Sequence, residues 1–204
     1  MRNFLTDKEI KISKEFLSKG YTIQNTQSLR SLNKIKSKIT SISKKILGVK
    51  KLNLNFVHKY ISKDNINDFR LEVIKQMNAW EEFGYNYYSN APEFLSILCN
   101  NELMMQKNVN ISIQLPNDET SLLPIHSDVW SGDSPYEINL WIPLVDCYRS
   151  KSMYILEKKY LNNFFKKFKS KTTKIENSEK IYSKAKKFLK WLKVDFGKIL
   201  IFNQ

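Results

Sequence analysis

The chain contains only two histidines, and one of them, His126, is separated by a single residue from the carboxylate of Asp128. Side chains two apart on an extended segment project from the same face, about 7 Å apart at the backbone. An imidazole nitrogen and a carboxylate oxygen on one face can converge on one cation, and they would supply two corners of the two-histidine-one-carboxylate site that binds Fe(II). We therefore predict His126 and Asp128 as metal ligands. The other histidine, His58, has no ligand partner nearby in sequence, and we expect it to be structural or exposed.

Alone, the two-residue pattern has low specificity, because a histidine at a strand end often forms a hydrogen bond with a nearby aspartate. The flanking sequence favours the metal hypothesis. Apolar and polar residues alternate over 109–115 before the pair and over "YEINLWIPLVD" (136–146) after it, as in half-buried strands. The polar sides of these two predicted strands, which include Gln114, Asn139 and Trp141, would line one cavity with the metal.

The elements that must position these residues fall into two parts. Residues 1–104 are predicted to be mainly helical, with a capping box at Thr6 and Glu9 that begins the first helix and Gly20 that ends it. "GYTIQNT" is predicted to form a short strand and "EEFGYNYYSN" an irregular segment. Further helices are predicted at 29–47, 64–80 and 92–99.

Strands dominate the prediction for residues 105–204, where "SMYIL" and "GKILIFN" follow the two alternating segments. Residues 157–193 are rich in lysine and are predicted to be a helical insertion. One apolar helical face, from Ile181 to Leu192, is more typical of packing on a sheet than of binding to a membrane surface.

Composition limits the classes of partner. The formal net charge is +14, but lysine supplies most of the positive charge, arginine is scarce, and no nucleic-acid-binding motif is present. We therefore expect no nucleic-acid partner, although binding of nucleic acid or an anionic membrane by the lysine-rich segment stays an alternative. The N-terminus lacks a signal-peptide pattern, no apolar run reaches the roughly 18 residues of a membrane span, and Cys99 and Cys147 are isolated thiols. These features predict a cytoplasmic protein that is not bound to a membrane.

"LPIHSDVWSGDSPYEINLWIPLVDC" (123–147), followed by "SMYIL", resembles the core of the phytanoyl-CoA dioxygenase superfamily of Fe(II)/2-oxoglutarate oxygenases. The likeness is strongest to small bacterial members associated with surface-carbohydrate gene clusters. It covers about residues 105–156, and "GKILIFNQ" fits a late strand of the family fold. The resemblance implies an α+β chain forming a single oxygenase-like domain over 1–204. Its core would be a double-stranded β-helix, a jelly-roll related to cupins, with the N-terminal helices packed on one sheet.

For the site, the resemblance implies that His126 and Asp128 bind Fe(II), with Trp141 near 2-oxoglutarate and Gln114 on a strand that often contacts this cosubstrate. Asn139 is expected in the same cofactor-binding cavity. The implied enzyme is a dioxygenase that uses O₂ to hydroxylate a small metabolite, in particular a sugar or nucleotide-sugar.

Two departures from the family pattern bear on this expectation. "EKKY" replaces the Pro-Gly-Ser-His turn of the family, and no histidine follows residue 128, so the distal iron ligand and the arginine that binds 2-oxoglutarate are missing. We expect these residues beyond Gln204, with the sequence truncated and the barrel incomplete at its C-terminus. The alternative is a catalytically inactive jelly-roll binding module that lacks a complete iron site.

Overall fold

The computed structural model describes residues 4–116, 125–161 and 178–203, except for four side chains, and the chain divides into two compact units. Unit 1 contains the predicted metal pair and most of the strands. The side chains that are not described within these ranges are those of residues 130, 131, 178 and 179. Unit 1 comprises Met1–Gln24, Phe94–Asn100 and Leu123–Gln204, and unit 2 comprises Asn25–Glu93 and Asn101–Leu122.

Unit 1 begins with helix α1 (Asp7–Lys19), whose two ends follow from local sequence signals. The Thr6 hydroxyl accepts a hydrogen bond from the backbone N–H of Glu9, and the Glu9 carboxylate accepts one in return from the backbone N–H of Thr6. Gly20 ends the helix in the left-handed region, with φ of 83°, which a residue without a Cβ adopts at little cost. The predicted capping box and the predicted helix end at Gly20 are both confirmed.

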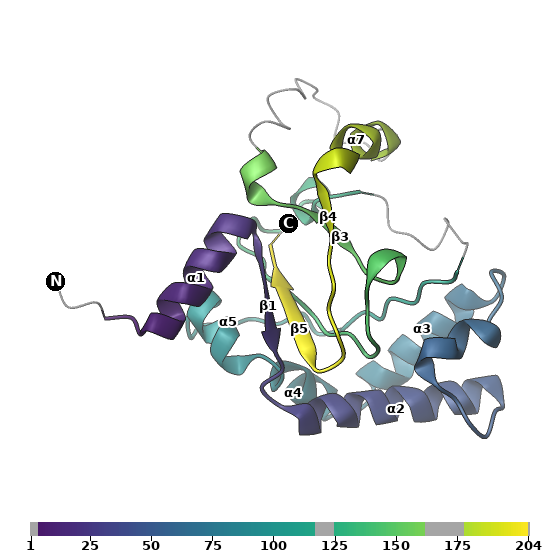
Figure 1. Ribbon diagram of the computed structural model, residues 1–204. Helices are drawn as coiled ribbons and strands as arrows, with labels where there is room; N and C mark the ends of the chain where they lie inside the picture. The colour runs from purple at the N-terminus through teal and green to yellow at the C-terminus, as the bar shows by residue number, and fades with distance from the viewer. Residues whose placement is uncertain (1–3, 117–124, 162–177, 204) are drawn as a thin grey trace. The chain divides into compact units, whose positions relative to one another are not determined.

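Two small sheets form the centre of unit 1, and strands β1 (Tyr21–Asn25) and β5 (Lys198–Phe202) lie side by side (Figure 1). Strand β2 (Asn139–Trp141) pairs antiparallel with the other edge of β5. The second sheet pairs β3 (Tyr154–Leu156) with β4 (Leu189–Trp191), also antiparallel.

One apolar cluster joins residues of both sheets. Its buried members are accompanied by partly buried residues from β1, β2 and β3, including Trp141. Full burial of one such side chain contributes about 1.5–3 kcal/mol, so the cluster stabilises the pairing of the two sheets. The buried members are Tyr21, Leu192, Val194, Leu200 and Phe202.

Shorter elements complete unit 1. Helix α5 (Pro92–Cys99) has its first two residues in unit 2, while α7 (Ser178–Ala185) runs into a 3₁₀ turn, η6 (Lys186–Phe188), directly before β4. Two further 3₁₀ turns are η3 (Asp128–Ser131) and η4 (Arg149–Lys151).

Unit 2 is built from helices α2 (Leu29–Leu47), α3 (Ile66–Asn78) and α4 (Phe83–Tyr88) and the 3₁₀ segment η1 (Leu54–Lys59). The apolar stripe of α2 is buried as its helical spacing predicts, and Gly48 ends the helix. The buried residues of α2 and α3 include Leu32, Ile35, Ile39, Ile42, Phe69, Val73 and Met77.

The mixed class is confirmed, since helices and small antiparallel sheets occur in the same chain. Three local predictions are wrong. Residues 109–115 form no strand, although the exposure of their side chains alternates as predicted. Residues 83–88 form α4 rather than an irregular segment. The predicted helical insertion contains β4, because Leu189, which fits the helical face, also alternates with Trp191 and pairs with Leu156 on β3.

Over the described ranges, the strands do not close into a barrel. In that same part of the chain, no helix combines the length and apolar character needed to cross a membrane.

Candidate functional site

Asp128 is the first residue of the 3₁₀ turn η3, and His126 lies two residues before it outside any strand, so the predicted strand position is wrong. The turn forms because Gly132, with φ of 100°, reverses the chain, and its backbone N–H donates to the Val129 carbonyl at 3.3 Å. The backbone N–H of Asp133 donates to the Asp128 carbonyl at 3.3 Å. The turn therefore sets the backbone that carries the Asp128 carboxylate.

The structure nevertheless brings the two side chains together. His126 Nε2 lies 3.6 Å from Asp128 Oδ1, and the two side chains are 42% and 25% exposed. At this distance the contact is longer than an ordinary N–H···O hydrogen bond. The pair is therefore close and reachable from solvent, without being locked into a short direct bond.

The two oxygens of the Asp128 carboxylate have different neighbours, and Asn139 binds one of them. Its side-chain amide Nδ2 donates to Asp128 Oδ2 at 2.9 Å, while Oδ1 faces the His126 imidazole. Groups that bind the outer oxygen of a ligating carboxylate orient it toward the metal. Asn139 was predicted to bind the cofactor, but its amide is engaged with Asp128 in this structure.

Strand β2 places Asn139 through its pairing with β5. Asn139 is opposite Phe202 and Trp141 is opposite Leu200, so Asn139 and Trp141 share one face of β2. Trp141 packs against the apolar cluster of unit 1. The predicted cofactor residue Trp141 therefore forms part of an apolar wall on the face that also carries Asn139.

Asn203 holds the segment that leads from the η3 turn to β2, a role that the sequence analysis missed. Its side-chain amide donates to the backbone carbonyls of Pro135 at 3.0 Å and Glu137 at 2.8 Å. An asparagine at the end of an apolar strand was the only available signal. The residue after β5 thus fixes the chain between Asp128 and Asn139.

The donor set of the pair fits a divalent cation. Two ligand atoms at about 2.1 Å from one ion lie about 3.0 Å apart in octahedral geometry and about 3.4 Å apart in tetrahedral geometry. The observed separation of 3.6 Å requires only a small side-chain rotation to reach these values. No third histidine, cysteine or carboxylate joins the pair as a metal-binding group within the described residues.

The remaining predicted residues lie in unit 2. Gln114 is exposed, and His58 is partly buried, with its ring centroid 6.3 Å from that of Phe56. The cofactor role of Gln114 stays a prediction.

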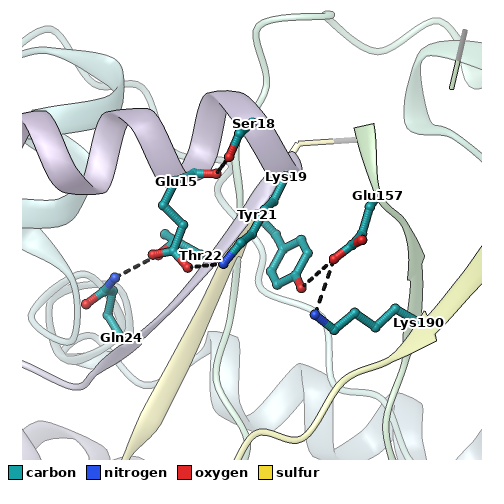
Figure 2. A network of polar contacts seen from close by, with 8 residues as sticks. All are labelled: Glu15, Ser18, Lys19, Tyr21, Thr22, Gln24, Glu157 and Lys190. Atoms are coloured by element: carbon teal, nitrogen blue, oxygen red, sulfur yellow. Dashed lines mark hydrogen bonds and ion pairs between the residues drawn. The ribbon is translucent and has the colours of Figure 1, made fainter. Parts of the chain in front are cut away.

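A second polar centre of unit 1 surrounds Glu157, the first residue of the "EKKY" segment (Figure 2). Glu157 accepts hydrogen bonds from Lys190 Nζ at 3.2 Å and from the Tyr21 hydroxyl at 3.4 Å, and it forms an ion pair with Lys159 at 2.8 Å. The two lysines, with Lys159 first, hold the pKa of the Glu157 carboxyl below its usual value, against the opposing effect of burial.

A third polar group ties α1 to β1 (Figure 2). Glu15 accepts hydrogen bonds from Lys19 Nζ at 2.7 Å and from the hydroxyl of the fully buried Thr22 at 2.9 Å. Burial raises the pKa of Glu15, but the bonds from Lys19 and Thr22 outweigh it and leave the pKa lowered. Both oxygens are engaged by the protein, so Glu15 connects two elements of the fold.

No family model matches the sequence, and neither the curated proteins nor the solved structures include a match.

Proposed function

We propose that the protein is a non-haem Fe(II)- and 2-oxoglutarate-dependent dioxygenase in which His126 and Asp128 bind the iron. The supporting observation is the arrangement of the carboxylate: Oδ1 faces the imidazole at 3.6 Å, while Asn139 occupies Oδ2. A histidine and a carboxylate that occupy neighbouring coordination positions are two of the three protein ligands of the facial site for Fe(II). The substrate would be a small metabolite, with a sugar or nucleotide-sugar favoured by the family resemblance.

The finer fold belongs to the same proposal. We assign the two small sheets of unit 1 to a jelly-roll core of the double-stranded β-helix type. In support, residues of both sheets meet in one apolar cluster, and β2 carries Asn139 on the face that contributes Trp141 to this cluster. The pair would then lie at the edge of the space between two sheets, as ligands do in such folds.

The residues of this chain would hold and orient the reacting groups. His126 Nε2 and Asp128 Oδ1 would bind the cation, and Asn139 would keep the carboxylate turned toward it. When bound with 2-oxoglutarate and O₂, the iron would supply the oxidising power for hydroxylation of a C–H bond. Trp141 would exclude water on one side, because its ring packs with the apolar cluster.

A competing explanation is that the pair is a simple ionic contact. Surface ion pairs of this kind contribute about 0–1 kcal/mol and often have no functional role. The two explanations differ in cation binding. A metal site binds Co(II) or Fe(II) stoichiometrically, whereas an ion pair binds neither.

The test is an anaerobic titration of the full chain with Co(II), in which visible absorption reports ligand binding. We expect one site per chain and a loss of affinity of more than about 100-fold in His126→Ala or Asp128→Ala, because the loss of even an outer-shell partner costs about 10–100-fold. His58→Ala is the matched control, since it removes the other histidine and should leave the spectrum unchanged.

Activity is tested separately by following succinate formed from 2-oxoglutarate with Fe(II) and O₂. Unchanged Co(II) binding in both pair variants would exclude the proposed site. If the chain binds metal but forms no succinate with Fe(II), the dioxygenase function is excluded, and the site is that of a metal-binding module.

A further inference from the structure

An open groove on unit 1 shares none of its lining residues with the His126–Asp128 pair. It has a volume of about 570 Å³, which is within the range of small-molecule sites. Its lining combines two aromatic rings with two cations and two carboxylates. These residues are Tyr148, Trp191, Arg149, Lys193, Asp146 and Asp195.

The aromatic part of the groove is held in place and yet faces solvent. Trp191 on β4 is opposite Tyr154 on β3, and their ring centroids are 5.1 Å apart at an interplanar angle of 79°. Trp191 is still 43% exposed, and Tyr148 is 46% exposed. A fixed tryptophan with an open face can cover an apolar surface of a ligand at little entropic cost.

The charged side chains of the groove differ in the hydrogen bonds and ion pairs that they form within the protein. Asp146 Oδ1 accepts a hydrogen bond from the backbone N–H of Phe196 at 2.8 Å. Asp195 lies between two lysines, with Oδ1 3.7 Å from Lys193 Nζ and Oδ2 3.6 Å from Lys198 Nζ. By contrast, the Arg149 guanidinium has no ion pair or side-chain hydrogen bond with any residue that the structure describes. Arg149 is thus the cation of the groove that can accept a new anion.

The backbone of Arg149 adds a second observation. Its φ of 49° lies in the left-handed region, which costs a residue with a Cβ about 1–2 kcal/mol. Such conformations concentrate at functional positions, where the surroundings determine them. Arg149 therefore combines a strained backbone with a guanidinium that has no side-chain partner among the described residues, and it lies beside exposed aromatic rings.

We infer that the groove binds an acidic saccharide. A sugar ring places its C–H face on Trp191, a hydroxyl donates to the Asp146 carboxylate, and its carboxylate or phosphate pairs with Arg149. Nucleic acid fits less well, because Arg149 can pair with one anionic group, while the two carboxylates repel the further phosphates of a nucleic-acid backbone. This site is separate from the proposed metal pair, and neither depends on the other.

The experiment measures ligand binding to the full chain by NMR of the tryptophan indole N–H groups. The chain contains four tryptophans, and the Trp191 signal is identified as the one missing in Trp191→Phe. The probes are glucuronate, glucose 6-phosphate, glucose and inorganic phosphate. We expect at least one of the acidic sugars to shift the Trp191 signal with a Kd of about 1 mM or tighter, glucose to bind at least about tenfold more weakly, and phosphate to leave it unchanged.

Arg149→Gly is the decisive variant, because it removes the guanidinium, while glycine adopts the left-handed backbone without a Cβ penalty. Circular dichroism of the variant checks that it is folded. The substitution should weaken the acidic sugar at least about tenfold and leave glucose unchanged. Tyr148→Ala should weaken all sugars, and Arg30→Ala, at an exposed arginine in unit 2, is the charge control. The inference is overturned if neither acidic sugar shifts Trp191, if Arg149→Gly binds like wild type, or if inorganic phosphate or a single-stranded oligonucleotide shifts the same signal equally.

Discussion

Asp128 and Glu157 are both carboxylates of unit 1 that lie beside nitrogen groups, but their surroundings differ. The Glu157 side chain is 11% exposed, and its oxygens are shared among Lys159, Lys190 and Tyr21. The Asp128 side chain is 25% exposed, with one oxygen bound by Asn139 and the other facing an imidazole at 3.6 Å. A carboxylate whose oxygens are all occupied by protein donors stabilises the fold, whereas one with a free oxygen can bind a ligand.

The first prediction tests this contrast on stability. Glu157→Ala should lower the free energy of unfolding by about 1–3 kcal/mol, because a mostly buried carboxylate is lost and its Tyr21 and Lys190 partners are left without an acceptor. Asp128→Ala should change it by less than about 1 kcal/mol, as expected for a partly exposed pair. Urea unfolding followed by circular dichroism measures both values, and equal losses would remove the distinction between the two carboxylates.

The second prediction tests the metal-binding role of Asp128 by removing its hydrogen-bond partner Asn139. Asn139→Ala should weaken Co(II) binding by about 10–100-fold, since the hydrogen bond to Oδ2 no longer orients the carboxylate. Leu140→Val on the same strand is the control for disturbance of β2, and it should bind Co(II) like wild type. If the control loses as much affinity as Asn139→Ala, the effect belongs to the strand and not to the amide.

The third prediction concerns pH. The lowered pKa of Glu157 means that its contribution to stability is fully present above the ordinary value of 4.5 and is lost as the pH falls through the lowered pKa. The difference in unfolding free energy between wild type and Glu157→Gln should therefore be constant near neutral pH and shrink in acid. Urea titrations at a series of pH values measure it, and a difference that grows in acid would contradict the assigned network.

The parts of the fold that could be predicted are those set by local signals. The capping box of Thr6 and Glu9, the stop at Gly20 and the apolar stripe of α2 all act within a few residues of the chain. The residues of β4 fitted a helix equally well, and their pairing with β3, which lies more than thirty residues earlier, decided the outcome. Whether a short segment forms a strand depends on the strand that it pairs with, and the pairing register between distant segments cannot be read from local sequence patterns.

The same difference between local and long-range contacts decides which parts of the candidate site could be predicted. The closeness of His126 and Asp128 could be predicted because only one residue separates them. The hydrogen bond from Asn139, 11 residues later, depends on where β2 starts, and β2 is positioned by its register with β5. Glu157 could not be found from sequence, since Tyr21 is 136 residues from it and Lys190 is 33 residues from it.

The last and smallest effect is expected from Tyr21→Phe, which removes one donor to Glu157 and keeps the ring in the apolar cluster. At 3.4 Å this hydrogen bond is long, and Glu157 retains Lys159 and Lys190, so the loss should be about 0.5 kcal/mol. In a double-mutant cycle with Glu157→Gln, the coupling should be of similar size. A much larger loss would mean that Tyr21, and not the two lysines, is the main partner of Glu157. The carboxylate would then depend for stability on a buried neutral donor rather than on the two ion pairs.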